Sequence, residues 1–227
     1  MPPAYGSDGD LYRRKEAELI HECRQLADRG LVVAAAGNAS ARVGEHILVT
    51  CSGAAFARLT PEDLSLVDSS GDVVSGSRRP TSELALHLLA HQRPDVAAVM
   101  HTHGRHAVAL STVAAEVPAV HYYIVDLGGA VPVAPYRQYG TSDLAMVTTQ
   151  ALGSGSAVVM SHHGSLTIGT CLAQAAARAE LLEWLCQVAL LALGAGAPAT
   201  LTPAELTEVH TAMQASRRRA ASPGEAR

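Results

Sequence analysis

The sequence has few aromatic residues and few cysteines, and it has no long uninterrupted hydrophobic run. One Phe, one Trp and six Tyr stand among 227 residues, so Ala, Val and Leu must fill most of the core. The four cysteines are widely and irregularly spaced, which excludes the disulfide framework of a small secreted protein and favours a reducing, cytoplasmic compartment. The longest apolar stretch, 185–195, is too short to cross a bilayer, and the N-terminus lacks the apolar segment of a signal peptide. We therefore expect no membrane partner.

The charge balance and the hydrophobic content exclude two further classes of protein. Lys and Arg number 17 against 21 Asp and Glu, and no basic stripe accompanies an aromatic platform of the kind that grips nucleic acid. We therefore expect no nucleic-acid partner. Hydrophobic residues make up 48% of the chain, which excludes disorder for most of it.

Hydrophobic periodicity predicts one α/β domain over residues 10–214, with flexible ends at 1–9 and 215–227. Two short β-like runs flank Gly44 and predict a hairpin, so the first third of the chain should be antiparallel sheet with one leading helix. We expect helices at 11–29, from 81 or 82 to before Pro94, at 104–112, 141–150 and 171–193, and after Pro203. We expect strands at 40–43, 46–50, 64–68, 73–76, 95–103, 131–136 and 157–164.

Histidine is the residue that the sequence has in excess. There are 11, and six of them lie between His87 and His121. Side chains alternate across a strand, so His101 and His103 should project from the same face and reach one ion together. This spacing suits a metal ligand pair.

A second apolar strand, 157–164, also ends in histidines. Only one of His162 and His163 can face the first pair, and Gly164 favours His163, because a glycine lets the chain turn and bring the preceding ring inward. His162 is then structural. Three neutral imidazoles that leave an open position are typical of catalytic zinc, and the absence of cysteine partners argues against a closed structural site. The alternative is that these histidines are hydrogen-bonded core or surface residues.

Glu83 falls in the first turn of the helix predicted to begin near Thr81 or Ser82. An acidic residue there often serves only to cap the helix, and the alternative is a general base close to the metal. His87 and His91 follow at intervals of four residues and share the helix face of Glu83. We interpret them as packing and supporting residues rather than ligands.

Three short segments have the composition of anion-binding turns: 37–40, 51–53 and 81–82. Backbone N–H groups at glycine turns and at a helix N-terminus, with hydroxyl groups beside them, bind phosphate without a lysine. Each segment alone is equally typical of an ordinary turn or helix cap. The sequence contains neither a Walker A loop nor a G-x-G-x-x-G motif, so nothing in it supports nucleotide binding.

Taken in chain order, these pieces resemble a known family. The sequence is similar to the class II aldolase/adducin family, and within it to the L-fuculose-1-phosphate aldolase branch, from about Leu11 to about Gln214. Seven motifs carry the resemblance in the order of the family: GNAS, TCSG, PTSE, HTH, HYY, APYRQYGT and HHG.

The resemblance implies a fold, a cofactor and an assembly. The fold is a three-layer α/β domain with a central, mostly antiparallel sheet flanked by helices. The cofactor is one Zn²⁺ per subunit, and the assembly is a homotetramer with active sites at the subunit interfaces. The implied reaction is the reversible cleavage of a ketose 1-phosphate, L-fuculose 1-phosphate, to dihydroxyacetone phosphate and a small aldehyde, L-lactaldehyde.

The resemblance also implies roles for individual residues. It makes His101, His103 and His163 the zinc ligands and Glu83 the catalytic acid/base. Tyr122 matches a tyrosine that reaches a neighbouring subunit's site and protonates the aldehyde oxygen. The phosphate-binding positions are Asn38, Ser52, Gly53, Thr81 and Ser82, and Tyr139 matches a residue that lines the aldehyde pocket. Two departures from the family pattern are a Thr at 81 where a Ser is usual, and the lack of any Tyr after Tyr139.

Other activities occur on the same implied fold. A 5-deoxyribulose-1-phosphate-type aldolase of nucleoside salvage and a phosphotetronate decarboxylase are the alternatives that keep both the Glu and the histidines. The epimerases of the family generally carry Asp at the position of Glu83. A non-enzymatic module would be expected to lose the metal histidines, and this sequence retains all three.

Overall fold

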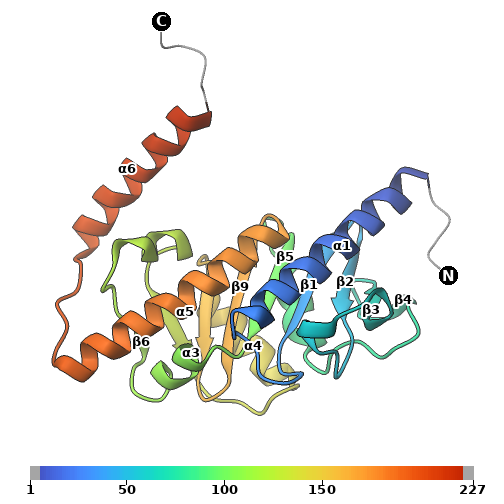
Figure 1. The fold of residues 1–227 in the computed structure, drawn as a ribbon, viewed down its shortest axis with the longest axis horizontal. Helices are drawn as coiled ribbons and strands as arrows, with labels where there is room; N and C mark the ends of the chain where they lie inside the picture. The colour runs from blue at the N-terminus through green and yellow to red at the C-terminus, as the bar shows by residue number, and fades with distance from the viewer. Residues whose placement is uncertain (1–5, 222–227) are drawn as a thin grey trace, which may run out of the picture.

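The computed structural model describes residues 6–221, and within this range nine strands form one sheet (Figure 1). The strand order is β4-β3-β2-β1-β5-β9-β8-β7-β6, and every neighbouring pair is antiparallel except β7 and β8. The strands are β1 (Asn38–Val43), β2 (His46–Thr50), β3 (Leu64–Val67), β4 (Val73–Ser75), β5 (Ala98–Thr102), β6 (Glu116–Val117), β7 (Val131–Ala134), β8 (Ala157–Met160) and β9 (Gly164–Gly169). The expected α/β domain with a mostly antiparallel sheet is confirmed.

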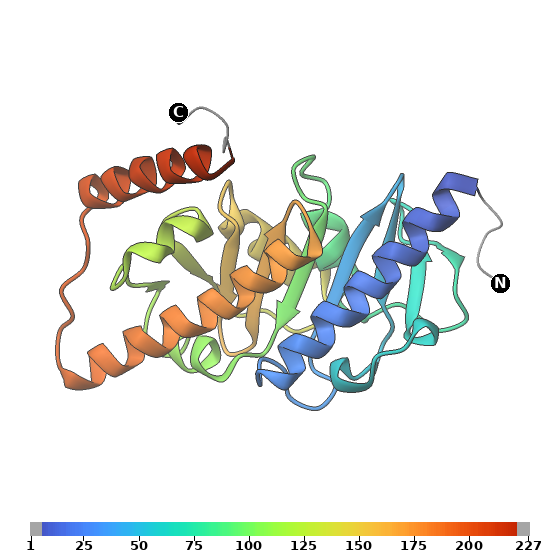
Figure 2. The ribbon, with the colours of Figure 1, turned by 45° about the horizontal axis from the view of Figure 1, so that its top comes forward.

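Helices cover both faces of this sheet, so the domain has three layers. Figures 1 and 2 show α1 and α5 lying across one face, where α3 also packs, while α2 and α4 pack on the other. The helices are α1 (Gly6–Asp28), α2 (Leu84–Ala90), α3 (Arg105–Leu110), α4 (Ser142–Leu152), α5 (Leu172–Ala195) and α6 (Pro203–Ala221). Short 3₁₀ helices occupy Phe56–Arg58, Pro61–Asp63 and Tyr122–Leu127.

The alternation of side chains along the central strands divides the core between the two faces. In β5, Met100 packs with α1 and α5, whereas Val99 packs with α2 and α4. In β1, Ala39 and Ala41 also belong to the α1 and α5 side. The intervening positions of β1 and the position of His101 therefore face α2, which is the side that carries the candidate site.

Several predicted boundaries need correction. Helix α1 begins at Gly6 rather than near Leu11, and α6 continues to Ala221 through the first half of the segment expected to be a flexible end. Residues 215–221 are mostly Ala and Arg, which are good helix formers, so the small side chains do not end the helix. The rest of the expected flexible ends, 1–5 and 222–227, lies outside the described residues.

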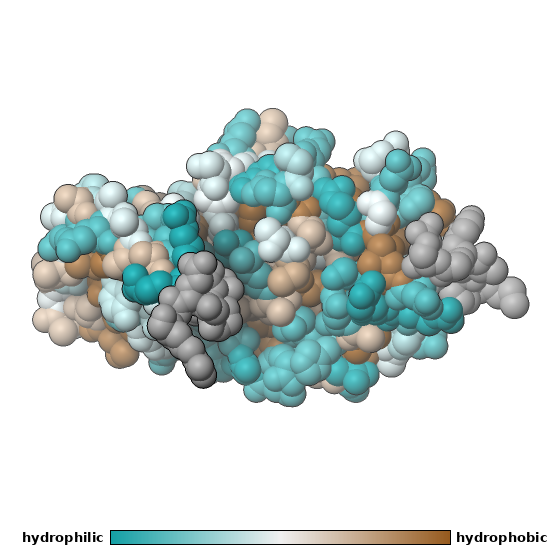
Figure 3. All heavy atoms as spheres, turned by 90° about the horizontal axis from the view of Figure 1, so that it is seen from above, coloured by the Kyte–Doolittle hydropathy of each residue, from teal (hydrophilic) through white to brown (hydrophobic). Residues whose placement is uncertain are grey.

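No helix in the described part of the chain is both long enough and apolar enough to cross a membrane. Figure 3 shows hydrophilic residues spread over one face of the molecule, with the hydrophobic ones in separate patches between them. The four cysteines are all free, as their spacing predicted.

The turn between β8 and β9 differs from its prediction in one respect. His162, and not Gly164, adopts the left-handed backbone conformation, with φ of 56°. Gly164 is needed for a different reason: a Cβ atom on it would overlap the carbonyl oxygen of Thr102 on the neighbouring strand β5. The glycine therefore lets the turn that carries His163 lie directly against β5.

We predict that Gly164→Ala lowers the free energy of unfolding by about 1–3 kcal/mol, because the added methyl group must push β9 away from β5. Chemical denaturation monitored by circular dichroism measures this change. The matched control is Gly194→Ala inside α5, where a Cβ meets no atom within 4 Å and stability should stay the same or rise by up to about 1 kcal/mol. Equal stabilities of the two variants would contradict the close-approach explanation.

Candidate metal centre and substrate cavity

Four side chains meet at one edge of the sheet. One ligand atom from each of Glu83, His101, His103 and His163 lies within 4.8 Å of the other three. His101 is in β5, His103 follows that strand, and His163 is in the turn after β8. Because β5 and β8 both run antiparallel to β9, which lies between them, the two strands end at the same edge. The structure thus brings together the three histidines and the glutamate that the sequence singled out.

The ring of His101 is held in one tautomer. Its Nδ1–H donates to the carbonyl oxygen of Ser165 at 2.9 Å, so its Nε2 carries the lone pair. That nitrogen lies 2.9 Å from His103 Nε2 and 3.1 Å from Glu83 Oε2. The ring is fully buried. His101 therefore presents a fixed electron-pair donor to the centre of the cluster.

His103 reaches the cluster by a different route from the one expected. Strand β5 ends at Thr102, so strand alternation alone does not orient His103. Its backbone N–H donates to the carbonyl oxygen of Leu31 at 2.9 Å, which fixes the chain just past the strand end. The centroids of the His101 and His103 rings lie 4.7 Å apart.

Glu83 does not cap helix α2. It occupies the N-cap position itself, one residue before the helix, rather than the first turn, and its side chain makes no capping hydrogen bond. Its Oε2 accepts a hydrogen bond from Asn38 Nδ2 at 2.9 Å. Its Oε1 lies 3.4 Å from His163 Nε2 and, although buried, has no hydrogen-bond partner. The structure thus rules out capping as the role of this carboxylate.

The charge state of the cluster is set by burial and by its own members. Burial alone would raise the pKa of Glu83, but His101, Asn38 and His163 together lower that pKa well below its ordinary value. A partly dry pocket by itself would suggest a raised pKa for this carboxyl group, but its polar neighbours outweigh burial. Burial also lowers the pKa of His103 to about 3 and depresses that of His163. Burial thus favours the neutral form of both rings, which is the form that binds a metal ion.

This donor set fits a divalent metal ion. Imidazole nitrogens and a buried carboxylate oxygen without a partner point at one another, and only a cation or added protons at their centre relieve the repulsion between the lone pairs. Nitrogen and oxygen ligands of this kind suit zinc and its neighbours among the transition metals. The residues present are sufficient for the three-histidine site that the sequence predicted.

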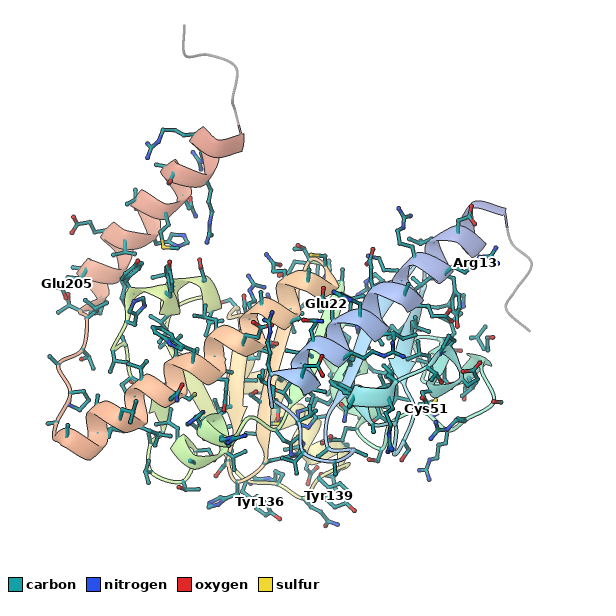
Figure 4. The ribbon with its side chains drawn as sticks, in the orientation of Figure 1. Arg13, Glu22, Cys51, Tyr136, Tyr139 and Glu205 are labelled. Atoms are coloured by element: carbon teal, nitrogen blue, oxygen red, sulfur yellow. The ribbon has the colours of Figure 1, made fainter. Side chains whose placement is uncertain are left out.

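A cavity of about 350 Å³ opens beside this cluster. Its wall includes most of the residues that the family resemblance had proposed for catalysis and binding: Asn38, Ser52, Gly53, Thr81, Ser82, Glu83, His103, Tyr139 and His163. The wall also includes Tyr136, Arg137 and His162, which we did not predict as site residues. Two of these belong to the APYRQYGT motif and one to HHG, so the quoted motifs carried the signal. Tyr136 and Tyr139 project from the lower edge of the molecule in Figure 4.

Two polar turns form part of the cavity wall. An isolated β-bridge joins Cys51 to Pro80, and the N–H of Thr81 donates to the carbonyl oxygen of Thr50 at 3.0 Å. This pairing places Ser52 and Gly53 beside the residues that precede α2. The hydroxyl oxygen of Thr81 accepts a hydrogen bond from the N–H of Glu83, which leaves its O–H free to donate.

Tyr122 lies outside the cavity of its own chain. It begins the 3₁₀ helix Tyr122–Leu127, and 41% of its surface is exposed. Its ring stacks on that of His121, which also contacts Tyr123 and Trp184. These four residues form an exposed aromatic patch.

Comparison with known proteins agrees with this site. The family model of the class II aldolase and adducin N-terminal domain matches residues 17–190. L-fuculose phosphate aldolase of Escherichia coli K12 is 34% identical over 78% of this chain and 82% of its own. The 5-methylthioribulose-1-phosphate/5-deoxyribulose-1-phosphate aldolase of Rhodospirillum rubrum is 34% identical over 84% of this chain and 87% of its own.

A solved structure shows the same fold. An L-fuculose 1-phosphate aldolase superposes with a TM-score of 0.85 at 31% identity, covering 92% of this chain and 98% of the other. The matched residues include the whole metal cluster and both polar turns. The chain therefore belongs to the class II aldolase and adducin family, and it is an aldehyde-lyase of the class II aldolase type.

Proposed function

We propose that this protein is a zinc-dependent aldolase that reversibly cleaves L-fuculose 1-phosphate to dihydroxyacetone phosphate and L-lactaldehyde. The observation that carries the proposal is the cluster of three histidines and a carboxylate, one of whose oxygens has no hydrogen-bond partner, at the wall of a cavity that two polar turns also line. This arrangement supplies a metal site, a base and an anion-binding region within one space.

His101, His103 and His163 would hold the zinc ion. When bound, the ion supplies a positive charge that polarises the substrate's carbonyl and hydroxyl oxygens and offsets the negative charge that develops as the C–C bond breaks. The hydrogen bond from His101 to Ser165 keeps the Nε2 lone pair of that ring available. No lysine Schiff base is required.

Glu83 is the residue that moves the proton. In the direction of synthesis its Oε1 removes a proton from C3 of dihydroxyacetone phosphate, and in the direction of cleavage it returns that proton. The lowered pKa keeps the carboxylate ionised, and the lack of a hydrogen-bond partner leaves Oε1 available. Its other oxygen stays fixed by Asn38.

The substrate phosphate would lie against the two polar turns. The hydroxyl groups of Ser52, Thr81 and Ser82 and the backbone N–H groups of Gly53 and Ser82 would supply the donors, and Asn38 lines the same cavity. The backbone N–H groups of Ser52 and Thr81 are already bonded to the carbonyl oxygens of Arg79 and Thr50. Binding a dianion through N–H and O–H donors needs no lysine. The aldehyde end of the substrate would then lie toward Tyr139.

The proposed assembly is a homotetramer in which Tyr122 acts on a neighbouring subunit's site. The exposed aromatic patch supports this proposal, because Tyr122 cannot serve the cavity of its own chain and its ring is free for contact with another copy. In that position the phenol O–H would donate a proton to the aldehyde oxygen. We place the enzyme in the cytoplasm, in keeping with its free cysteines.

A second candidate substrate is 5-deoxyribulose 1-phosphate, for which the aldehyde product would be acetaldehyde. The relative from R. rubrum is as similar to this chain as the relative from E. coli K12 is. Both candidates use the same metal cluster, the same base and the same phosphate site. They differ only in the small aldehyde that lies near Tyr139.

We predict that the purified protein condenses dihydroxyacetone phosphate with L-lactaldehyde to a ketose 1-phosphate. Exhaustive chelation should abolish this activity and added Zn²⁺ should restore it, because the neutral histidines bind the metal ion but cannot replace its positive charge. Product formation measured by chromatography over a panel of aldehydes that includes acetaldehyde gives kcat/KM for each. Activity that survives chelation and is trapped by borohydride would contradict the metal mechanism. Carbon dioxide release from a phosphotetronate, with no aldol product, would show a decarboxylase instead.

We predict that Glu83→Gln lowers kcat by about 10²–10⁴-fold, because the amide cannot accept the proton from C3. The substitution retains the shape of the side chain, so KM and the zinc content should change little. Steady-state kinetics and metal analysis measure both. Glu45→Gln, in the exposed hairpin turn, is the control and should behave as the unmodified protein does. A Glu83→Gln variant with full activity would exclude Glu83 as the base.

We predict that Glu83→Gln and Tyr122→Phe subunits complement each other. If Tyr122 acts on a neighbouring site, co-expressed and separately tagged subunits form mixed tetramers, and about a quarter of their sites combine an intact Glu83 with an intact Tyr122. Activity of the purified mixture should therefore exceed that of either parent. Tyr123→Phe, which is equally exposed, is the control and should keep its activity without a partner. Monomers in solution, or mixed tetramers no more active than the parents, would contradict the assembly.

A further inference from the structure

A buried polar stripe runs between α2 and β1, on the side of the sheet that carries the metal cluster. Glu83, His87 and His91 are spaced by four residues and lie along one side of α2. Asn38 and Ser40 are spaced by two residues and lie on the facing side of β1. All five side chains are buried, and His87 and Ser40 are fully so. Only the first members of the two rows line the cavity.

Hydrogen bonds link the five side chains in one chain. His91 Nε2 lies 2.9 Å from Ser40 Oγ, and Ser40 Oγ lies 2.7 Å from His87 Nδ1. His87 Nε2 lies 2.6 Å from Asn38 Oδ1, and Asn38 Nδ2 lies 2.9 Å from Glu83 Oε2. The chain thus begins outside the cavity and ends on the carboxylate.

The direction of donation in this chain is determined by its last member. An ionised Glu83 only accepts, so Asn38 must turn its NH₂ group toward it and its carbonyl oxygen toward His87. His87 must then donate from Nε2, and a neutral His87 accepts from Ser40 at Nδ1. Ser40 in turn has its only proton in use, so it accepts from His91 Nε2–H at 2.9 Å. His91 Nδ1, which lies 3.3 Å from the carbonyl oxygen of Val96, then carries no proton and makes no hydrogen bond there. Burial lowers the pKa of His87 to about 3, which agrees with a neutral ring.

Packing of α2 against the sheet does not by itself require a buried polar stripe. Five buried polar side chains stabilise a fold less well than apolar residues of similar volume would, unless every partner is kept. The neighbouring pairs on α2 and the sheet, such as Leu86 with Val99, are apolar and buried. The polar stripe follows one side of α2 from Glu83 to His91, and each of its members contacts the next.

We propose that His87 is a positioning residue for the reaction proposed above, which it influences only through Asn38 and Glu83. By donating to Asn38 Oδ1, His87 prevents the Asn38 amide from turning over and presenting its oxygen to the carboxylate. Ser40 and His91 hold the ring of His87 in the tautomer that donates. Glu83 thereby keeps Oε2 bound and Oε1 directed at the cavity.

The tautomer itself is the first test, and it does not depend on catalysis. Nitrogen-15 NMR of the purified protein, with histidine assignments from single substitutions, distinguishes a protonated ring nitrogen from a bare one. We expect His87 to carry its proton on Nε2 and a bare Nδ1 at neutral pH. A proton on Nδ1 of His87 would overturn the proposal, because Asn38 would then have no donor.

Two substitutions separate positioning from general support of the fold. The substitution His87→Asn places an amide near the position of the ring's Nδ1 and leaves Asn38 Oδ1 without a donor. The substitution His87→Gln extends an amide N–H to about the position of the ring's Nε2, from which it can still donate to Asn38. We expect His87→Asn to lower kcat by about 10–100-fold with KM within about threefold of the unmodified protein, and His87→Gln to recover most of kcat. His21→Asn, on the exposed side of α1, is the control.

The outcomes of these kinetics distinguish the two proposals. If the unmodified protein forms no ketose phosphate, the proposed function fails, and the NMR result alone decides the hydrogen-bond chain. If the unmodified protein is active and His87→Asn keeps its kcat, or if Gln and Asn lower activity equally, His87 is not a positioning residue. Circular dichroism and zinc content of each variant identify any loss that comes from misfolding.

Discussion

The carboxylate of Glu83 lies buried against two imidazole nitrogens, 3.1 Å from His101 and 3.4 Å from His163, and much of the surrounding structure is needed to keep it there. Glu83 occupies the N-cap position of α2, but its side chain makes no capping hydrogen bond to the helix. The carboxylate instead accepts a hydrogen bond from Asn38 on β1. In the sheet, Asn38 is paired directly with His101 on β5. The same pair of strands thus fixes Asn38, which holds Glu83, and His101.

Strand β9 determines whether His163 can reach the cluster formed by Glu83, His101 and His103. It lies between β5 and β8, so the turn that carries His163 must pass across the end of β5. Gly164 permits this because its missing Cβ lets the turn approach the carbonyl oxygen of Thr102. The same strand provides the carbonyl of Ser165 that fixes the tautomer of His101. Strand β9 therefore sets both the position of His163 and the tautomer of His101.

Much of this fold and site was predictable from the sequence, and the misses have physical causes. The hairpin around Gly44 and the strand before His101 have strong periodic patterns, and both form as expected. Strand β9 was missed because its alternating polar and apolar run, 165–168, is only four residues long and lies between two glycines, which are typical of turns. The net lowering of the pKa of Glu83 was missed for a different reason: it depends on contacts with Asn38 and His101, which only the three-dimensional fold creates.

The scarcity of aromatic residues has a structural meaning. In the described part of the chain, Phe56 is buried in the core and Tyr12 packs against it partly buried. The other described aromatic side chains, Tyr122, Tyr123, Tyr136, Tyr139 and Trp184, are all exposed. A protein with so few aromatic residues would bury them if stability of the single chain were their main use, since each covers a large apolar area. Instead, one group lines the mouth of the cavity and the other forms the patch around His121. The core depends on aliphatic packing, and most of the described aromatic side chains lie where a substrate or a second subunit can reach them.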